Sequence, residues 1–305
     1  MSRELGLGLQ GDKRPGAYGT LAADAEAAGF DVVTVYNDLF FQPSLPALLE
    51  VAGATQRVRL GPSCLNPFTL HPVEIAGQAA AVDAASGGRA FLGLAAGAWL
   101  DRLGFDDLRS LTAIRETWAI VRALLRGDDS GFAGELFTLV PGSRLAYEPL
   151  RRSLPLLVGT WSPRLTAFAA AEADELKLGG SANPALVRLV RERLGEGTRL
   201  VVGAVTVVDA DDAAARDHAW REVALYLPVV ARRDPTVDAA SLDRDRLLDL
   251  FAFAGDPSRI AEQAEALFEA GADRVEFGTP HGLHARRGVA LLGERVLPAL
   301  RQLMA

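Results

Sequence analysis

The side chains that could take part in chemistry stand directly after predicted strands. A β-branched run at 31–36 (DVVTVY) is followed by a carboxylate, and the run at 57–63 (RVRLGPS) is followed by a thiol. Most of the other strand ends carry glycine or a small polar residue, and few carry charge. Such ends predict a cleft for a flat, uncharged ring with a phosphate-bearing tail. The candidate residues are Asp38, Ser63, Cys64, Asn66, Gly97, Ala98, Gly159, Thr160, Gly179, Gly180, Ser181 and His281.

Other kinds of catalytic site find little support in the sequence. A glycosidase-type hydrolase needs acidic residues on facing strands, and only Asp38 and Glu276 are candidates. Glu276 lies in the middle of its predicted strand, so it points either into the barrel or toward the helices. A Ser/His/Asp triad lacks the G-x-S-x-G turn, and four scattered histidines with one cysteine form no metal-ligand cluster. We therefore favour neither hydrolysis nor a metal site.

Two loops could bind the phosphate of a cofactor tail. Residues 159–163 (GTWSP) and 179–184 (GGSANP) each lead from a strand into a helix N-terminus. Backbone N–H groups and the helix dipole at such a position favour an anion. Tight turns with capping residues look the same in any α/β fold. The sequence therefore leaves open whether these loops bind phosphate or only begin helices.

The segment 57–100 has the order strand, loop, helix, strand. Pro72 suits the first turn of a helix, and Gly87 and Gly88 suit its end. The strand that follows, 90–95 (AFLGLA), is apolar almost throughout, as expected of a strand buried on both faces. The loop at 63–72 is longer than the connection needs, and long loops after strands often carry functional sites.

Strands and helices alternate along the rest of the chain. An amphipathic helix is predicted at 106–126, with a small hairpin at 132–140. Near the C-terminus we predict a short helix at 247–254, a loop at 278–282 and a last helix at 288–304. The eight predicted strands are 5–9, 31–36, 57–63, 90–95, 154–159, 174–178, 200–208 and 274–277.

This order predicts an α/β protein with a (β/α)8 TIM barrel as a single domain, residues 1–305. The chain length of 305 residues suits such a barrel, with a hairpin insertion and an extended helical segment before the eighth strand. A doubly wound open sheet has the same local pattern and stays an alternative. In a barrel, the strand ends named above meet at one face, where sites are built.

Composition narrows the class of protein. The content of 49% hydrophobic and 23% charged residues is typical of an ordinary globular protein. The net charge of −7 argues against a nucleic-acid partner. The single cysteine fits a reducing cytoplasm, the N-terminus has no signal-peptide pattern, and no apolar run approaches the length of a membrane span. We expect a cytoplasmic protein that acts on a small molecule.

Several segments together resemble the luciferase-like flavin and deazaflavin oxidoreductases. The longest, 55–97, has the family's Asn-Pro loop, His-Pro helix start and Ser-Gly-Gly-Arg turn. Segments 29–38, 159–179 and 253–282 match its other spaced motifs. The sequence FGTPHG at 277–282, followed by LLGERVLP, most resembles the methylenetetrahydromethanopterin reductase branch, whose members use the deazaflavin coenzyme F420.

The resemblance implies a cofactor ring at the carboxyl ends of the barrel strands. In the deazaflavin members a bulge with a non-prolyl cis peptide backs the ring, and here it would fall at Ser63–Cys64. Asp38 matches the family's polar group after strand two and, with His281, is our candidate for a catalytic role. The other candidates would contact the cofactor, with Gly159, Thr160, Gly179 and Gly180 on its tail. Family members are commonly dimers, so we expect a homodimer.

Some candidates also have a purely structural interpretation. Cys64 has no neighbour in sequence that would activate it, which favours a small apolar filler over a reactive thiol. Asp38 could cap the next segment, and His281 could be an ordinary loop residue. Trp99 and Trp161 follow strand ends, where they would stack on a ring, cover the site or pack in the core.

The chain departs from the family pattern at three places. Leu39 stands where a histidine is common, residues 95–98 (AAGA) lack the acid that follows strand four, and residues 6–8 (GLG) replace a strand-one carboxylate. We therefore expect hydride transfer between coenzyme F420 and an organic substrate other than methylenetetrahydromethanopterin. The alternatives are an FMN-dependent monooxygenase and a degenerate barrel that binds a ligand without turnover.

Overall fold

Eight parallel strands close into a barrel in the computed structural model, which describes residues 3–105 and 108–304. The strand order is β3-β2-β1-β11-β9-β8-β7-β4. The barrel closes between β3 and β4, where the Phe91 N–H donates to the Leu60 carbonyl at 3.0 Å and the Leu65 N–H donates to the Gly93 carbonyl at 2.9 Å. The predicted (β/α)8 barrel is therefore confirmed, and the open sheet is excluded. The strands are β1 (Glu4–Leu9), β2 (Val32–Tyr36), β3 (Arg59–Ser63), β4 (Leu92–Ala95), β7 (Leu156–Gly159), β8 (Glu175–Gly179), β9 (Arg199–Val208) and β11 (Arg274–Gly282).

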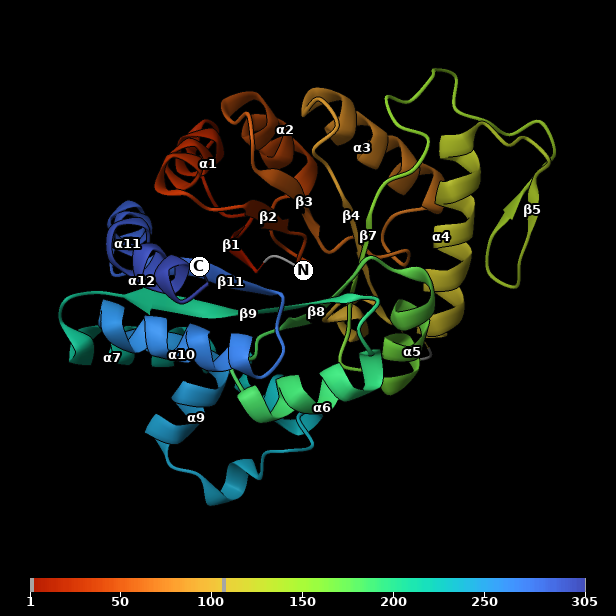
Figure 1. Cartoon of the computed structure of the whole chain (residues 1–305). Helices are drawn as coiled ribbons and strands as arrows, with labels where there is room; N and C mark the ends of the chain where they lie inside the picture. The colour runs from red at the N-terminus through yellow and green to blue at the C-terminus, as the bar shows by residue number, and fades with distance from the viewer. Residues whose placement is uncertain (1–2, 106–107, 305) are drawn as a thin grey trace.

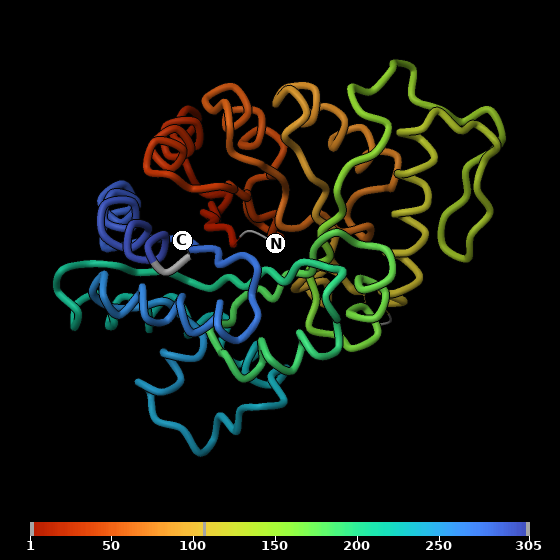
Figure 2. Tube along the Cα trace, in the orientation of Figure 1, coloured from red at the N-terminus to blue at the C-terminus, as the bar shows by residue number. Residues whose placement is uncertain are grey.

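Helices surround the strands, as Figure 1 shows. In Figure 2 the chain between α8 and α9 arches away from the barrel. Short 3-10 turns, η1 (Leu100–Leu103), η2 (Ala231–Arg233) and η3 (Ala239–Ser241), lie in the connections. The helices are α1 (Ala17–Ala28), α2 (Ser44–Ala54), α3 (Pro72–Ala85), α4 (Ser110–Arg126), α5 (Pro163–Glu172), α6 (Pro184–Leu194), α7 (Asp212–Val223), α8 (Leu227–Val230), α9 (Arg244–Phe251), α10 (Pro257–Glu269), α11 (Ala285–Leu291) and α12 (Leu297–Met304).

Local sequence explains where these helices begin. Proline occupies the first turn of α3, α5, α6 and α10, where its missing N–H costs no hydrogen bond. Asn183 and Asp256 cap two of them, and the Asp256 carboxylate accepts from the Ser258 N–H at 2.8 Å. Caps of this kind stabilise a helix by about 1 kcal/mol. No helix among residues 3–105 and 108–304 combines the length and apolar character needed to cross a membrane.

The C-terminal third differs from prediction in three elements. The predicted helix at 247–254 ends at Phe251. The next residues form strand β10 (Ala252–Gly255), which pairs in parallel with the C-terminal end of β9. All four β10 residues are buried, so burial against β9 outweighs local helix propensity. The predicted loop at 278–282 belongs to β11, which resumes its pairing with β9 after a register shift. The last helical region begins at Ala285 and contains a π-helical turn, η4 (Leu292–Val296).

The predicted amphipathic helix and hairpin both form. The described part of the helix is α4, since residues 106–107 lie outside the described ranges. Strands β5 (Phe132–Ala133) and β6 (Thr138–Leu139) form the hairpin, which stands off beside α4 in Figure 1. Three N–H groups of its turn, at Glu135, Leu136 and Phe137, donate to the Glu116 carboxylate at 2.6, 3.0 and 3.0 Å. Burial by itself would raise the pKa of Glu116, but these donors hold the pKa below its ordinary value.

Replacing Glu116 with glutamine should lower the free energy of unfolding by about 2 kcal/mol, because an amide N–H₂ would face backbone N–H groups. For a chain of this size the melting temperature should fall by about 4 °C. A carboxyl with a depressed folded-state pKa stabilises above its unfolded pKa and loses that effect as pH falls through the folded value. The loss of stability in the variant should therefore be complete at pH 7 and disappear at acidic pH. Thermal unfolding at several pH values measures it.

Glu135 supplies the matched control for this prediction. It lies in the same turn, and its side chain is 69% exposed and pairs with Arg109, the residue before α4. Glu135→Gln should change stability by less than about 0.5 kcal/mol. Equal melting temperatures for the two variants would show that Glu116 does not hold the hairpin.

Candidate active site

A cavity of about 220 Å³ lies at the carboxyl ends of the barrel strands. Strands β2, β3, β8, β9 and β11 and the residue after β1 line it, together with α7, α8 and the end of α9. This is the place where a barrel carries its site. The lining residues are Gln10, Tyr36, Asp38, Ser63, Lys177, Gly179, Gly180, Gly203, Ala204, Val205, Glu222, Val223, Tyr226, Val230, Phe251 and Thr279.

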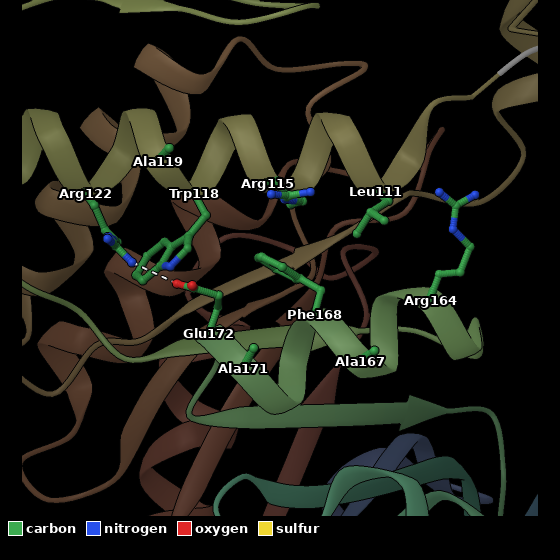
Figure 3. A pocket seen from close by; sticks show the side chains of 10 residues that line it. All are labelled: Leu111, Arg115, Trp118, Ala119, Arg122, Arg164, Ala167, Phe168, Ala171 and Glu172. Atoms are coloured by element: carbon green, nitrogen blue, oxygen red, sulfur yellow. Dashed lines mark hydrogen bonds and ion pairs between the residues drawn. The ribbon is translucent and has the colours of Figure 1, made fainter.

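A larger, open groove of about 510 Å³ lies on the outer surface between α4 and α5 (Figure 3). Trp118 and Phe168 project from the two helices into it, and Arg122 bridges to Glu172 at 2.9 Å. The groove is lined by helix residues rather than strand ends. We therefore place the candidate active site in the smaller cavity.

A buried ion pair that the sequence did not lead us to expect reaches the cavity wall through its lysine. Lys177 on β8 is 4% exposed, and its ammonium contacts Glu276 on β11 and donates to the Ser63 hydroxyl at 2.8 Å. Glu276 is fully buried and accepts from Thr34 at 2.7 Å. Burial by itself would raise the pKa of Glu276, but the charges of Lys177 and Arg274 hold the pKa below its ordinary value. The cavity therefore carries more charge than the strand ends in the sequence led us to expect.

Lys177 could have been noticed in the sequence. The strand 174–179 (DELKLG) is otherwise apolar after its first two residues, and lysine is almost never fully buried without a partner. A lysine in such a strand indicates a partner inside the barrel. The partner, Glu276, lies 99 residues away in the chain, so the pairing itself could not be predicted.

Asp38 lies in the cavity, as expected of a functional residue. Its carboxylate accepts from the Gln10 side-chain amide at 3.1 Å. Burial raises the pKa of Asp38 above its ordinary value, although the bond from Gln10 and the charge of Lys177 lower it in part. Burial also raises the pKa of Tyr226, another lining residue, to about 12. The raised pKa makes Asp38 a candidate for proton exchange with a bound substrate.

The peptide bond between Ser63 and Cys64 is cis, as the resemblance implied. Ser63 faces the cavity, whereas the Cys64 sulfur packs toward Gly93 and Gly159. A Cβ atom at Gly159 would lie 2.9 Å from that sulfur, so glycine makes room for the thiol. Burial raises the pKa of Cys64 to about 11, which keeps the thiol protonated. The geometry agrees with the interpretation of Cys64 as a filler.

The loops expected to bind a phosphate use several of their donors internally. The Thr160 N–H donates to the Lys177 carbonyl at 3.0 Å, and the Gly180 and Ser181 N–H groups donate to the Gly203 carbonyl at 2.6 and 3.3 Å. Ser181 is fully buried, and its hydroxyl accepts from the Asn183 N–H. These contacts favour the capping interpretation for Thr160, Gly180 and Ser181. Gly179 and Gly180 both line the cavity, and a Cβ atom at Gly179 would meet no atom within 4 Å.

His281 does not lie at the cleft mouth, which corrects our expectation. It is fully buried in the extended β11, and its Nε2 donates to the Gly8 carbonyl at 2.9 Å. Burial lowers the pKa of His281 to about 4, so the ring is neutral at pH 7. Because β11 continues past Gly278, the side chain joins the strand layer instead of a surface loop.

The remaining candidates lie around the cavity rather than in it. The Asn66 side-chain oxygen accepts from the Phe68 and Thr69 N–H groups at 3.1 and 3.0 Å, so this residue organises the loop after β3. Gly97 and Ala98 are exposed in the loop after β4. None of these three lines the cavity.

Aromatic residues in the loops after the strands contact one another beside the cavity-lining Tyr226. Trp99, just after β4, contacts Tyr226 with ring centroids 5.8 Å apart. Arg102, in the same loop, stacks over Phe40 at 5.9 Å from the ring centroid. Phe40 is 69% exposed and has a φ of 69°, a conformation unusual for a bulky residue. The loop after β4 therefore contacts both the β2 loop and the cover formed by α7 and α8. Trp161 instead donates to the Gly179 carbonyl at 3.0 Å.

A family model described as luciferase-like monooxygenase matches residues 3–274. The chain belongs to this family. It is 27% identical over 317 residues to 5,10-methylenetetrahydromethanopterin reductase of Archaeoglobus fulgidus, covering 91% of this chain and 93% of that protein. It is also 27% identical over 323 residues to F420-dependent glucose-6-phosphate dehydrogenase of Nakamurella multipartita, covering 95% of this chain and 94% of that protein.

Among solved structures, the chain is similar to the coenzyme F420-dependent tetrahydromethanopterin reductase of Methanopyrus kandleri. The TM-score is 0.87 at 23% identity, over 98% of this chain and 100% of that chain. This likeness confirms the barrel fold of the luciferase-like family.

Proposed function

We propose that this chain is an oxidoreductase that transfers hydride between coenzyme F420 and a small organic substrate. The main observation is that two relatives, each aligned over more than nine-tenths of the chain, have names that specify different substrates. One substrate is a tetrahydromethanopterin and the other is a sugar phosphate. The names of the sugar-phosphate enzyme and of the structurally similar reductase both include coenzyme F420. Because the cofactor is shared while the substrate varies, the cofactor is the property best transferred to this chain.

The cavity fits the ring of a deazaflavin. Its volume of about 220 Å³ is below the roughly 300–1,000 Å³ of sites that enclose a whole drug-sized ligand, so it would take the ring and leave the tail outside. Gly179 supplies a flat wall that a side chain would fill, and Ser63 lies at the floor. When bound, the deazaflavin supplies the carbon that gives or takes the hydride. The protein binds and orients the ring and excludes water.

Asp38 is the residue to which we assign the proton. Interconversion of an alcohol and a carbonyl moves a proton as well as a hydride. Asp38 is the cavity carboxyl whose pKa is raised by burial, and Gln10 orients it. It would accept the proton during oxidation and return it during reduction. His281 is left out of this role because it is buried against Gly8 and does not line the cavity.

The aromatic residues beside the cavity favour an organic substrate with an apolar part. Tyr226 lines the cavity and contacts Trp99, and the nearby Phe40 is largely exposed. Exposed aromatic side chains often mark binding sites. The acidic residue that follows strand four in the family pattern is absent here, since residues 95–98 are AAGA. We infer that substrate recognition depends more on apolar contact than on charge.

Titration of the purified protein with each cofactor tests the proposal. We expect quenching of deazaflavin fluorescence with a dissociation constant of micromolar or below, and no comparable binding of FMN. A yellow protein that retains FMN would favour the monooxygenase alternative. Failure to bind either cofactor at micromolar concentration would support the non-catalytic barrel and overturn the proposal.

We also propose that the protein acts as a single-domain homodimer in the cytoplasm. The support is the family membership and the one-cysteine composition. Light scattering coupled to size-exclusion chromatography should give twice the chain mass of 32.4 kDa. A monomeric mass would contradict the dimer without affecting the proposed chemistry.

A further inference from the structure

The buried ion pair in the cavity is oriented with its cation toward the ligand space. Lys177 lines the cavity, whereas Glu276 lies behind it, fully buried, and is not among the lining residues. Glu276 is held by Thr34 at 2.7 Å, and its second oxygen lies 3.8 Å from Arg274 Nε. The Lys177 ammonium lies 5.2 Å from the centroid of the Tyr36 ring, another lining residue. Of this ion pair, a molecule in the cavity would therefore meet the ammonium and not the Glu276 carboxylate.

The ammonium has donor capacity left for a ligand. A protonated lysine carries three N–H donors. Two are accounted for by the Ser63 hydroxyl at 2.8 Å and by the Glu276 carboxylate. Burying two charges is costly unless geometry and hydrogen bonds compensate. A pair that ends at a cavity wall, with one donor to spare, is well placed to act on the ligand.

We propose that Lys177 donates its third hydrogen bond to the bound ring and stabilises the reduced form relative to the oxidised form. The inference rests on the proposed function, since it concerns the ring of coenzyme F420. Reduction adds a hydride, and with it an electron pair, so the reduced ring is the more electron-rich of the two. A fixed cation beside the ring favours that state, because charge and hydrogen bonds near a redox ring tune its potential.

The test compares the affinity for both redox forms in a charge-neutral variant. Lys177→Met alone would leave Glu276 buried without its closest cation, so the variant is Lys177→Met/Glu276→Gln, which removes both charges at similar volume. Affinity for oxidised coenzyme F420 is measured by fluorescence quenching, and affinity for the reduced form by competition. We expect the preference for the reduced form to fall about tenfold, the usual order for a charged hydrogen bond. For a two-electron couple this lowers the midpoint potential by about 30 mV.

A control variant separates the direct role from a structural one. Thr34→Val perturbs Glu276 from behind, at a residue that does not line the cavity, and should leave the ratio of the two dissociation constants unchanged. If Thr34→Val reproduced the loss of preference, the effect would come from the position of Glu276 rather than from the cation beside the ring, and the proposal would be overturned.

The outcomes distinguish this inference from the proposed function. If the unaltered protein binds coenzyme F420 but the double variant keeps its preference, the inference fails alone. If the unaltered protein binds neither redox form, the proposed function fails and the inference falls with it. If the double variant does not fold, the test is the affinity of the unaltered protein for the two redox forms. Tighter binding of the reduced form supports the proposal, and equal affinity for the two forms overturns it.

Discussion

Replacing Gly179 with valine is expected to weaken the binding of coenzyme F420 about a hundredfold, or about 2.7 kcal/mol. Gly179 ends β8 and lines the cavity, and its added Cβ would meet no protein atom within 4 Å. The valine side chain would therefore occupy the space proposed for the ring while leaving the fold intact. Fluorescence titration measures the affinity, and the melting temperature checks the fold.

Gly197 provides the matched control. It too has open space at its Cβ position, and it lies in the turn before β9, away from the cavity. Gly197→Val should bind the coenzyme as the unaltered protein does. Gly180 is less suitable, because its φ of 80° and a contact with Val230 at 3.1 Å would strain any side chain. If Gly179→Val kept full affinity, the ring would have to bind outside this cavity.

Replacing Asp38 with asparagine is expected to lower kcat about 10²- to 10⁴-fold, the usual contribution of general acid–base catalysis. The cofactor should still bind, because the substitution keeps the shape of the side chain and its bond to Gln10. In the direction of substrate oxidation Asp38 must be ionised. Since burial raises its pKa, the acidic limb of the rate profile should lie above the ordinary range of an aspartate. The limb should disappear in the variant.

Asp12 is the control for this prediction. It follows the same end of β1 as Gln10, but its side chain is 51% exposed and pairs with Lys13 on the surface. Asp12→Asn should change neither kcat nor the acidic limb. Rates are measured from pH 4 to 9 with a substrate that the unaltered protein oxidises. A variant at Asp38 that kept its rate and its acidic limb would remove this residue from the mechanism.

Local signals placed most elements correctly. Pro72, Pro163, Pro184 and Pro257 all lie in the first turn of a helix, because a missing N–H is tolerated there. Apolar runs became barrel strands because strands buried on both faces need no polar alternation. The segment 252–255 failed as a prediction because its partner β9 lies far away in the chain, and pairing with it outweighs the local preference.

The site was predictable in position but not in charge. Ser63, Asp38 and Gly179 were identified because each lies at or just beyond the end of a strand, and parallel strands bring their carboxyl ends to one face. His281 was misplaced because the register shift that carries β11 past Gly278 leaves no clear mark in the sequence. Lys177 was missed because its charge has meaning only beside Glu276.

The sequence by itself determined the alternation of strands and helices, the helix starts and the family, since these depend on neighbouring residues and on ordered motifs. Only the tertiary structure decided that the sheet closes between β3 and β4, that His281 points inward, and that Lys177 meets Glu276 across 99 residues. The physical reason is that closure and ion pairing are contacts between distant segments, whose energies appear only when the barrel brings the segments together.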